Sequence, residues 1–242
     1  MTAELFDEDL RSRRLERALR GGPVLFAYER AFEDIIERLA EVSRSFASAL
    51  LVGAPDPSWS EKLQQFAERV ELAPEPQYDF PPASFDLCVV IGALDTINDL
   101  PGALRQIGMS LKPDGLLLGA IPGGNTLPQL RAAMRAADLV AGAASPHVHP
   151  RIEASALGHL LTAAGFVMPV VDIDRVRVAY PSLLQLVSDL RGMGVSNVLR
   201  SRPRFISRAA LAAAEAHFRG AGEGGRTVET FELLHFAAWT PQ

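Results

Sequence analysis

The turn at residues 53–58, which reads Gly-Ala-Pro-Asp-Pro-Ser, stands where an α/β protein commonly binds a nucleotide cofactor. The apolar residues 49–52 predict a strand before it, and the residues from Trp59 onward predict a helix. Cofactor turns use glycine because the backbone must approach the ligand closely. Pro55 and Pro57 instead hold φ at about −65°, add rings and lack N–H groups. The pattern therefore favours a plain strand-to-helix turn, in which Gly53 keeps the first glycine position.

The start of the following helix has the spacing of a capping box, with Ser58 as N-cap and Glu61 three residues on. This pattern predicts that the first N–H groups of the helix are satisfied within the chain. Fewer of them would then be left for a ligand.

Two histidines, His147 and His149, lie two residues apart in Ser-Pro-His-Val-His-Pro and would share one side of an extended segment. A pair of imidazoles suits metal ligation, but no third ligand stands at a telling spacing, so we predict no metal site. The alternative is a rigid loop in which one histidine lines a pocket. Cys88, the single cysteine, lies in an apolar run and is predicted to be core.

Alternating helices and strands must position these residues. Helical spacing of apolar residues runs from Phe32 to Val42, and the continuously apolar run 85–94 is typical of a strand covered on both faces. Further strands are predicted near 69–72 and at 116–121, 168–181 and 227–239, and further helices at 99–112, 126–141 and 153–164. This order indicates an α/β fold with a doubly wound, mostly parallel sheet.

We expect a single domain over residues 1–242. It would comprise N-terminal helices at 1–47, a sheet core at 48–180, a helical cap at 181–219 and a final strand within 220–242.

The composition limits the partners. A net charge of −5 and a pI of about 5.6 argue against general nucleic-acid binding. The five arginines between Arg11 and Arg20 predict an amphipathic helix whose basic face is either simply solvated or docks an acidic partner. No stretch approaches the roughly 20 apolar residues of a transmembrane helix, and the acidic start does not resemble a targeting peptide. We expect a cytoplasmic protein, and its oligomeric state stays open.

Residues 84–131, which include "LKPDGLLLGAIPGGNTLPQLR", resemble the second half of a class I S-adenosylmethionine (SAM) methyltransferase. More narrowly, this stretch, "SPHVHP", "LGHLLTAAGF" and "YPSLLQLVSDLRGMGVSN" are similar to the methyltransferase-like assembly factors of respiratory complex I and their bacterial relatives. They are also similar to the biotin-pathway methyltransferase BioC. The segments cover most of residues 84–202.

This resemblance implies a seven-stranded sheet with SAM across the carboxyl ends of the first strands. It implies methyl transfer or, as for the mitochondrial assembly factor, SAM-linked hydroxylation of an arginine on a complex I subunit. The family's first strand runs into an Asp-Leu-Gly-Cys-Gly-x-Gly type turn, where this chain has Leu51 at the acidic position and prolines at the later glycines. About 35 residues separate Leu51 from Asp86, whereas two strand-helix units need roughly 50 to 60. A helix and a strand are therefore expected to be shortened or lost.

The candidate cofactor residues follow from the resemblance. An acidic residue that holds the ribose is expected about 20 residues after the glycine turn, where Glu71 and Glu75 stand. Asp79 and Phe80 would contribute an adenine edge, and Gly53 completes this set.

The candidate catalytic residue is Asp95, which stands after the strand 85–94 where relatives often have His-Trp. It would act as a general base if burial raised its pKa. The alternatives are a solvated loop carboxylate or a cap for the helix that begins near Pro101.

The family-like residues concentrate beyond this strand. Gly123 and Gly124 permit a tight path, and Asn125 would bind substrate or, like Thr126, merely cap the next helix. Arg131 would face an acidic partner or a substrate carboxylate. The full set of substrate or partner candidates is Gly123, Gly124, Asn125, Arg131, His147, His149, Tyr180, Arg191, Asn197 and Arg202.

Three hypotheses follow. The favoured one is a methyltransferase-fold protein with impaired or lost SAM binding that serves through its cap surface as an accessory or assembly protein, with a complex I subunit or another protein as partner. The second is an active SAM-dependent enzyme with an atypical cofactor turn. The third is a fold reused for another small ligand in the remaining cleft.

Overall fold

The computed structural model describes residues 4–73, 79–202 and 205–242, and it divides into two compact units. Unit 1 comprises Met1–Leu25, Gly124–Arg151 and Arg175–Glu232, and unit 2 comprises Phe26–Gly123, Ile152–Asp174 and Leu233–Gln242. None of the described helices has the length and hydropathy to cross a bilayer. The expectation of one domain, with its internal boundaries, stays a prediction.

The sheet has six strands among the described residues, in the order β2-β1-β3-β4-β6-β5. The strands are β1 (Phe46–Val52), β2 (Ala67–Ala73), β3 (Phe85–Ile91), β4 (Leu111–Pro122), β5 (Val167–Tyr180) and β6 (Thr227–Trp239). The first four are parallel, and β6 runs antiparallel to β4. The resemblance implied seven strands, whereas the described residues form six. The difference lies between β1 and β3, where the described residues form one short helix and one strand. The predicted shortening is confirmed.

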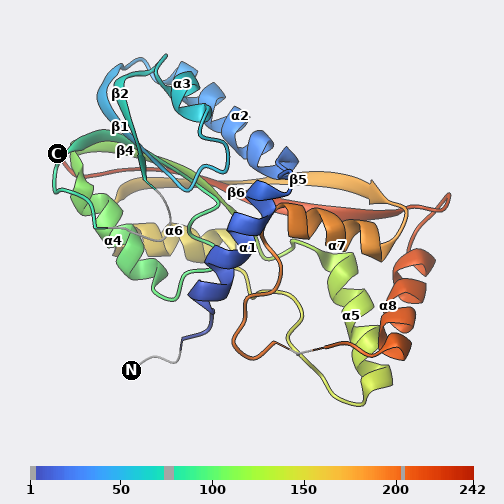
Figure 1. Cartoon of the computed structure of the whole chain (residues 1–242). Helices are drawn as coiled ribbons and strands as arrows, with labels where there is room; N and C mark the ends of the chain where they lie inside the picture. Colours follow the sequence, from blue (N-terminus) through green and yellow to red (C-terminus); the bar gives the residue numbers. More distant parts are fainter. Residues whose placement is uncertain (1–3, 74–78, 203–204) are drawn as a thin grey trace. The chain divides into compact units, whose positions relative to one another are not determined.

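Helices cover both faces of the sheet in unit 2 (Figure 1). One face carries α2 (Phe26–Glu41) and α3 (Trp59–Leu63), and the other carries α4 (Leu100–Ser110) and α6 (Ala154–Ala163). Because both faces are covered, β1 and β3 are almost entirely apolar and buried. The doubly wound α/β prediction is confirmed.

The packing of unit 2 is close at the centre of the sheet. A Cβ on Gly119 of β4 would overlap the ring of Phe236 and lie 2.8 Å from the carbonyl oxygen of Val90. Only glycine fits there, so β3, β4 and β6 approach one another around a single residue without a side chain.

Unit 1 is built on helices α1 (Glu8–Arg20), α5 (Pro128–Ala141), α7 (Leu183–Gly192) and α8 (Arg208–Gly220). Figure 1 shows α5 lying along α8, and α1 packs on α7. Local caps begin three of these helices, because Asp7, Ser182 and Ser207 each accept a hydrogen bond from a backbone N–H three residues on. The segment 181–219, which was predicted to be helical, contains α7 and most of α8, and residues 193–207 lie between them.

Candidate functional site

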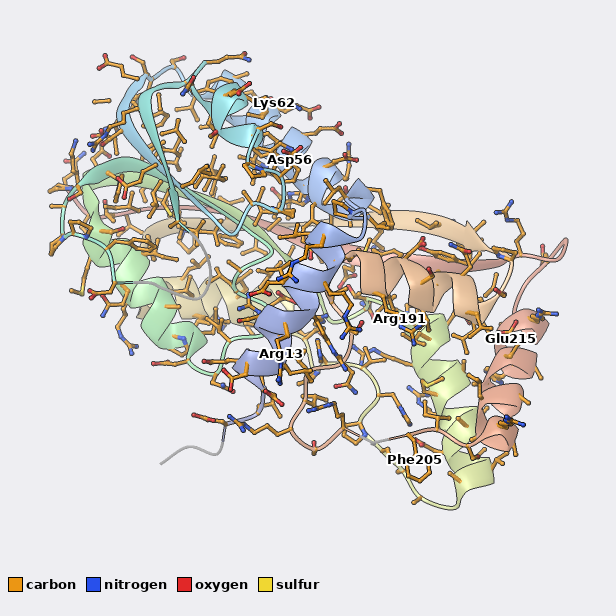
Figure 2. The ribbon with its side chains drawn as sticks, viewed as in Figure 1. Arg13, Asp56, Lys62, Arg191, Phe205 and Glu215 are labelled. Atoms are coloured by element: carbon orange, nitrogen blue, oxygen red, sulfur yellow. The ribbon has the colours of Figure 1, made fainter. Side chains whose placement is uncertain are left out.

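Several backbone N–H groups in the turn after β1 donate hydrogen bonds to acceptors of this chain. The N–H of Gly53 donates to the carbonyl oxygen of Ala73 at 3.3 Å, so β1 and β2 stay paired up to the turn. Asp56 then accepts from two successive N–H groups, with its carboxylate from Ser58 at 2.9 Å and with its carbonyl from Trp59 at 3.2 Å. Figure 2 labels Asp56 at this turn.

The predicted capping box is wrong. The side chain of Ser58 makes no capping hydrogen bond, although Ser58 does occupy the N-cap position. The carbonyls of Pro57 and Ser58 accept from the N–H groups of Ser60 and Glu61 instead. A helix of five residues begins with tight turn bonds of this kind, so the N–H groups are satisfied internally by a different set of acceptors.

Trp59 belongs to the core of unit 2. Its side chain is 2% exposed and stacks on Phe32 of α2, with ring centroids 4.5 Å apart and planes 5° from parallel. Lys62, labelled on α3 in Figure 2, places its Nζ 5.9 Å from the same Phe32 ring. The indole therefore fixes α3 to α2.

The candidate cofactor residues are spread along β2 and beyond it. Glu71 is exposed within β2, opposite Leu50 in the register, two residues before the strand ends. Glu75 lies outside the described residues. Asp79 is exposed and Phe80 is half-buried against the apolar core. The structure thus brings Gly53 to the end of β2 but leaves Glu71 inside the strand, and the cofactor roles stay predictions.

Asp95 is half-buried in the turn that follows β3. The alternative that it caps the next helix is wrong, because Asp99 is the N-cap of α4 and accepts from the N–H of Gly102 at 2.8 Å. Pro101 occupies the first turn of that helix, where its missing N–H costs nothing. The role of Asp95 as a general base stays a prediction.

A buried carboxylate of β6 in unit 1 holds the loop after β4. Glu232 is 1% exposed, and its Oε1 accepts from the N–H of Asn125 at 3.1 Å. Its Oε2 accepts from Nε of Arg175 at 3.0 Å and from Nδ2 of Asn125 at 3.4 Å. The hydroxyl of Thr126 also exchanges hydrogen bonds with both backbone groups of Glu232. Residues 125–126 are therefore fixed to the strand.

A second buried carboxylate of β6 accepts hydrogen bonds from the first N–H groups of α5. Glu229 accepts from the N–H groups of Leu130 at 2.8 Å and Gln129 at 3.3 Å, and burial raises the pKa of this carboxyl. Leu127 occupies the N-cap position in a left-handed conformation without a side-chain cap. The alternative that Asn125 or Thr126 caps this helix is therefore wrong, because Glu229 satisfies its first N–H groups from across the fold.

The two glycines that precede this loop follow the end of β4, and the tight backbone path expected there stays a prediction. Gly123, the last residue of this stretch in unit 2, forms an isolated parallel bridge with Ile152, and Gly124 follows it half-buried.

The two histidines of unit 1 have separate partners. His147 Nε2 lies 2.8 Å from Oδ1 of Asp138, and this contact keeps the pKa of Asp138 below its usual value although burial acts to raise it. His149 is 2% exposed and its Nε2 accepts from the N–H of Val198 at 2.8 Å. The described residues contain no group of three histidine, cysteine or acidic side chains placed to hold a metal ion.

A groove of about 190 Å³ lies beside α5 in unit 1. It is lined by Arg131, Met134, Arg135, Asp138, Ser145, Pro146, His147 and Val148. Arg131 is held at its edge by hydrogen bonds from Nε to the carbonyl of Thr126 and from Nη2 to that of His149. Two predicted substrate or partner residues, Arg131 and His147, therefore line this groove. The carbonyl of His149 holds Arg131 in place through a hydrogen bond.

The other candidates of unit 1 lie in or beside the segment after α7. Asn197 donates from Nδ2 to the carbonyl of Pro146 at 2.6 Å, and Arg202 donates to that of Leu199 at 2.8 Å. Tyr180 is buried, and this burial raises the pKa of its hydroxyl. Arg191 is exposed in the last turn of α7, where Figure 2 labels it.

Sequence reasoning missed the two glutamates of β6. The available signal was an acidic side chain inside a strand that is otherwise apolar, since buried carboxylates persist only with partners. Glu229 and Glu232 are an odd number of residues apart and so point to opposite faces, and both are buried.

The strand order and the antiparallel pairing of β6 with β4 define a protein of the class I methyltransferase fold. Residues 25–169 match the methyltransferase domain family. Among solved structures, YcgJ from Bacillus subtilis aligns with a TM-score of 0.54 and 12% identity over 88% of this chain and 99% of that one. The putative methyltransferase BH2331 from Bacillus halodurans gives a TM-score of 0.52 and 14% identity over 86% and 99%.

Sequence relatives define the protein more closely. The chain is 36% identical over 233 residues to the mitochondrial arginine-hydroxylase NDUFAF5 of Danio rerio, which covers 86% of this chain and 73% of that protein. The human NDUFAF5 is 33% identical over 98% of this chain and 77% of its own length. This chain belongs to the family of arginine-hydroxylase NDUFAF5. It is also 32% identical to a malonyl-[acyl-carrier protein] O-methyltransferase of Methylovorus sp. (strain MP688), over 66% of this chain and 53% of that enzyme.

Proposed function

We propose that this chain is an accessory or assembly protein of the NDUFAF5 family in which SAM binding is impaired or lost, and that it acts through the surface of unit 1. The carrying observation is the hydrogen bonding of residues 53–61. The partner that this resemblance supports is a subunit of respiratory complex I or another protein.

The turn after β1 supports the first half of the proposal. A charged or polar ligand at a strand-to-helix turn needs free N–H groups and close access to the backbone. Here Pro55 and Pro57 have no N–H, and the N–H groups of residues 58–61 have acceptors within the turn. A helix of five residues also has only a weak dipole, so its N-terminus attracts a negatively charged ligand weakly.

The second support is the position of the acidic candidate. A carboxylate that holds a ribose stands just beyond the carboxyl end of its strand, at the edge where cofactors bind. Glu71 lies inside β2, where its exposed side chain is two residues short of that end. This position disfavours Glu71 as the ribose ligand, whereas Glu75, the other acidic candidate, lies outside the described residues.

Unit 1 supports the second half of the proposal. Buried Glu229 and Glu232 hold residues 125–130 against β6, and Arg131 extends from this fixed segment into the groove beside α5. A recognition surface works best on such a rigid support.

Isothermal titration calorimetry with SAM and with S-adenosylhomocysteine tests the proposal on the full chain. We expect no binding at about 1 mM ligand. Micromolar affinity for either ligand would refute it. The double variant P55G/P57G, with circular dichroism as a fold control, tests the cause. A gain of SAM binding in this variant alone assigns the loss to the prolines.

A second candidate function is an active SAM-dependent methyltransferase or SAM-linked protein-arginine hydroxylase with an atypical cofactor turn. It is favoured by 33–36% identity to arginine hydroxylases over 86–98% of the chain. Incubation of the protein with SAM and isolated complex I subunits, followed by peptide mass spectrometry, decides this point. A SAM-dependent gain of one methyl group or one oxygen atom on a subunit would establish it.

A further inference from the structure

The two units differ sharply in charge. Unit 1 contains 17 arginines, no lysine and 11 acidic residues, which gives a net charge of +6. Unit 2 contains 7 basic and 18 acidic residues, for a net charge of −11. Arginine is enriched and lysine depleted at protein interfaces, because the guanidinium forms two parallel hydrogen bonds and is weakly hydrated. The net positive charge of unit 1, carried by arginines, suits an anionic partner.

Six of these arginines form a cluster, which we call the arginine cluster. It consists of Arg13, Arg14 and Arg17 on α1, Arg191 in the last turn of α7, and Arg200 and Arg202 in the segment that follows. Arg14 donates to the carbonyl of Asn197, and Arg202 donates to that of Leu199 at 2.8 Å. One short loop thus holds two guanidinium groups beside each other.

Two carboxylates form ion pairs with the arginine cluster among the described residues. Its central carboxylate, Asp7, lies 3.5 Å from Arg202 and is already engaged as the N-cap of α1. Glu4 pairs with Arg200. Within the described part of the chain, the exposed Arg13, Arg17 and Arg191 form no ion pair, and Figure 2 labels Arg13 and Arg191 on their helices.

Burial and like charge both act on the guanidinium at the centre of the cluster. Burial and the positive charges of Arg202, Arg17 and Arg191 lower the pKa of Arg14. Such a site gains free energy from any anion that comes between the guanidinium groups, because it then replaces repulsion with charge-assisted hydrogen bonds.

We propose that the arginine cluster docks an acidic segment of a partner protein. This inference rests on the proposed function in that it names the chemistry of the partner. Residues 13 and 17 are one helical turn apart, about 6 Å along the axis, which suits successive carboxylates of a short acidic stretch. A long nucleic acid is disfavoured as the partner because unit 2 has a net charge of −11. A bilayer is disfavoured because α1 exposes one large apolar side chain, Leu19.

Fluorescence anisotropy of the full chain with fluorescein-labelled octaglutamate, at low ionic strength, tests the docking. Octaglutamine is the uncharged control peptide. The cluster variant is R17E/R191E, and the matched control is R208E/R226E, which makes the same charge change at two exposed arginines of unit 1 outside the cluster. We expect the cluster variant to weaken octaglutamate binding by about tenfold or more and the control by less than about threefold.

Several results would overturn the inference. One is no octaglutamate binding by the unaltered chain at about 1 mM peptide, and another is an equal loss in both double variants. A third is tighter binding of an octathymidylate or of phosphatidylglycerol vesicles than of octaglutamate, lost in the cluster variant, which would assign the cluster to phosphates. The milder R17Q/R191Q variant serves if charge reversal impairs folding, as judged by circular dichroism. SAM is absent throughout, so SAM binding in the calorimetry refutes the proposed function without touching this result.

Discussion

Replacement of Glu232 by alanine should loosen the loop after β4 and destabilise the protein by about 2 kcal/mol. The main loss is the hydrogen bond from the N–H of Asn125 to a charged acceptor, worth roughly 1.5–3 kcal/mol. The ion pair with Arg175 adds at most about 1 kcal/mol, since the side chain of Arg175 is 56% exposed. Removal of a buried carboxylate returns part of its desolvation cost, which keeps the net effect near the middle of this range.

Two measurements check this expectation. Urea unfolding gives the change in the free energy of unfolding, and hydrogen-exchange mass spectrometry reports the N–H groups of residues 124–130. Glu223→Ala, at an exposed position of the same unit, is the matched control and should stay within about 0.5 kcal/mol of the unaltered chain. Faster exchange at residues 124–130 is expected in Glu232→Ala alone.

The Arg175→Ala variant shows whether the loop contact or the ion pair of Glu232 contributes more to stability. If the loop contact dominates, Arg175→Ala should cost about 1 kcal/mol or less, because its guanidinium is exposed. Equal costs for the two variants, or unchanged exchange at residues 124–130 in Glu232→Ala, would refute the view that Glu232 holds the loop.

Two further predictions concern unit 2. Burial lowers the pKa of His235, so the stability that neutral His235 contributes is complete above the unfolded pKa of 6.5 and is lost as the pH falls through the lower folded value. His235→Gln should therefore flatten the fall in unfolding free energy below pH 6.5, measured by urea unfolding from pH 5 to 8; an unchanged slope contradicts this. Trp59→Ala should cost about 3–5 kcal/mol through the cavity it leaves beside Phe32. A loss under about 1 kcal/mol would place Trp59 outside the core.

The strands were predictable because burial on both faces imposes a simple composition. β1 and β3 lie between two helical layers, and their uninterrupted apolar runs are visible in the sequence. The last strand was predicted at 227–239 and is found as Thr227–Trp239. The sequence distance between Leu51 and Asp86 also predicted the shortened first half, since chain length limits the number of elements that fit.

The helix caps were less predictable because several polar residues compete for the same N–H groups. Ser58 had the right neighbours for a capping box, yet Asp56 and the turn carbonyls took its place. At α4, Asp99 is the cap rather than Asp95. At α5 the acceptor is Glu229, 100 residues from Gln129 in the chain, and no local pattern contains it. Contacts set by tertiary structure decide such positions.

Residues 53–61 of unit 2 and residues 125–131 of unit 1 use their polar groups differently, and the proposed function rests on this contrast. At residues 58–61 the backbone N–H groups donate to acceptors within the turn, and Pro55 and Pro57 have no N–H to offer a ligand. At residues 125–131 two carboxylates are buried at a desolvation cost, and each fixes the same segment from β6. The segment that they fix leads directly to Arg131 and the groove beside α5, and a binding surface works best on such a rigid support. We therefore propose unit 1, rather than the turn after β1, as the part of the chain that binds a partner.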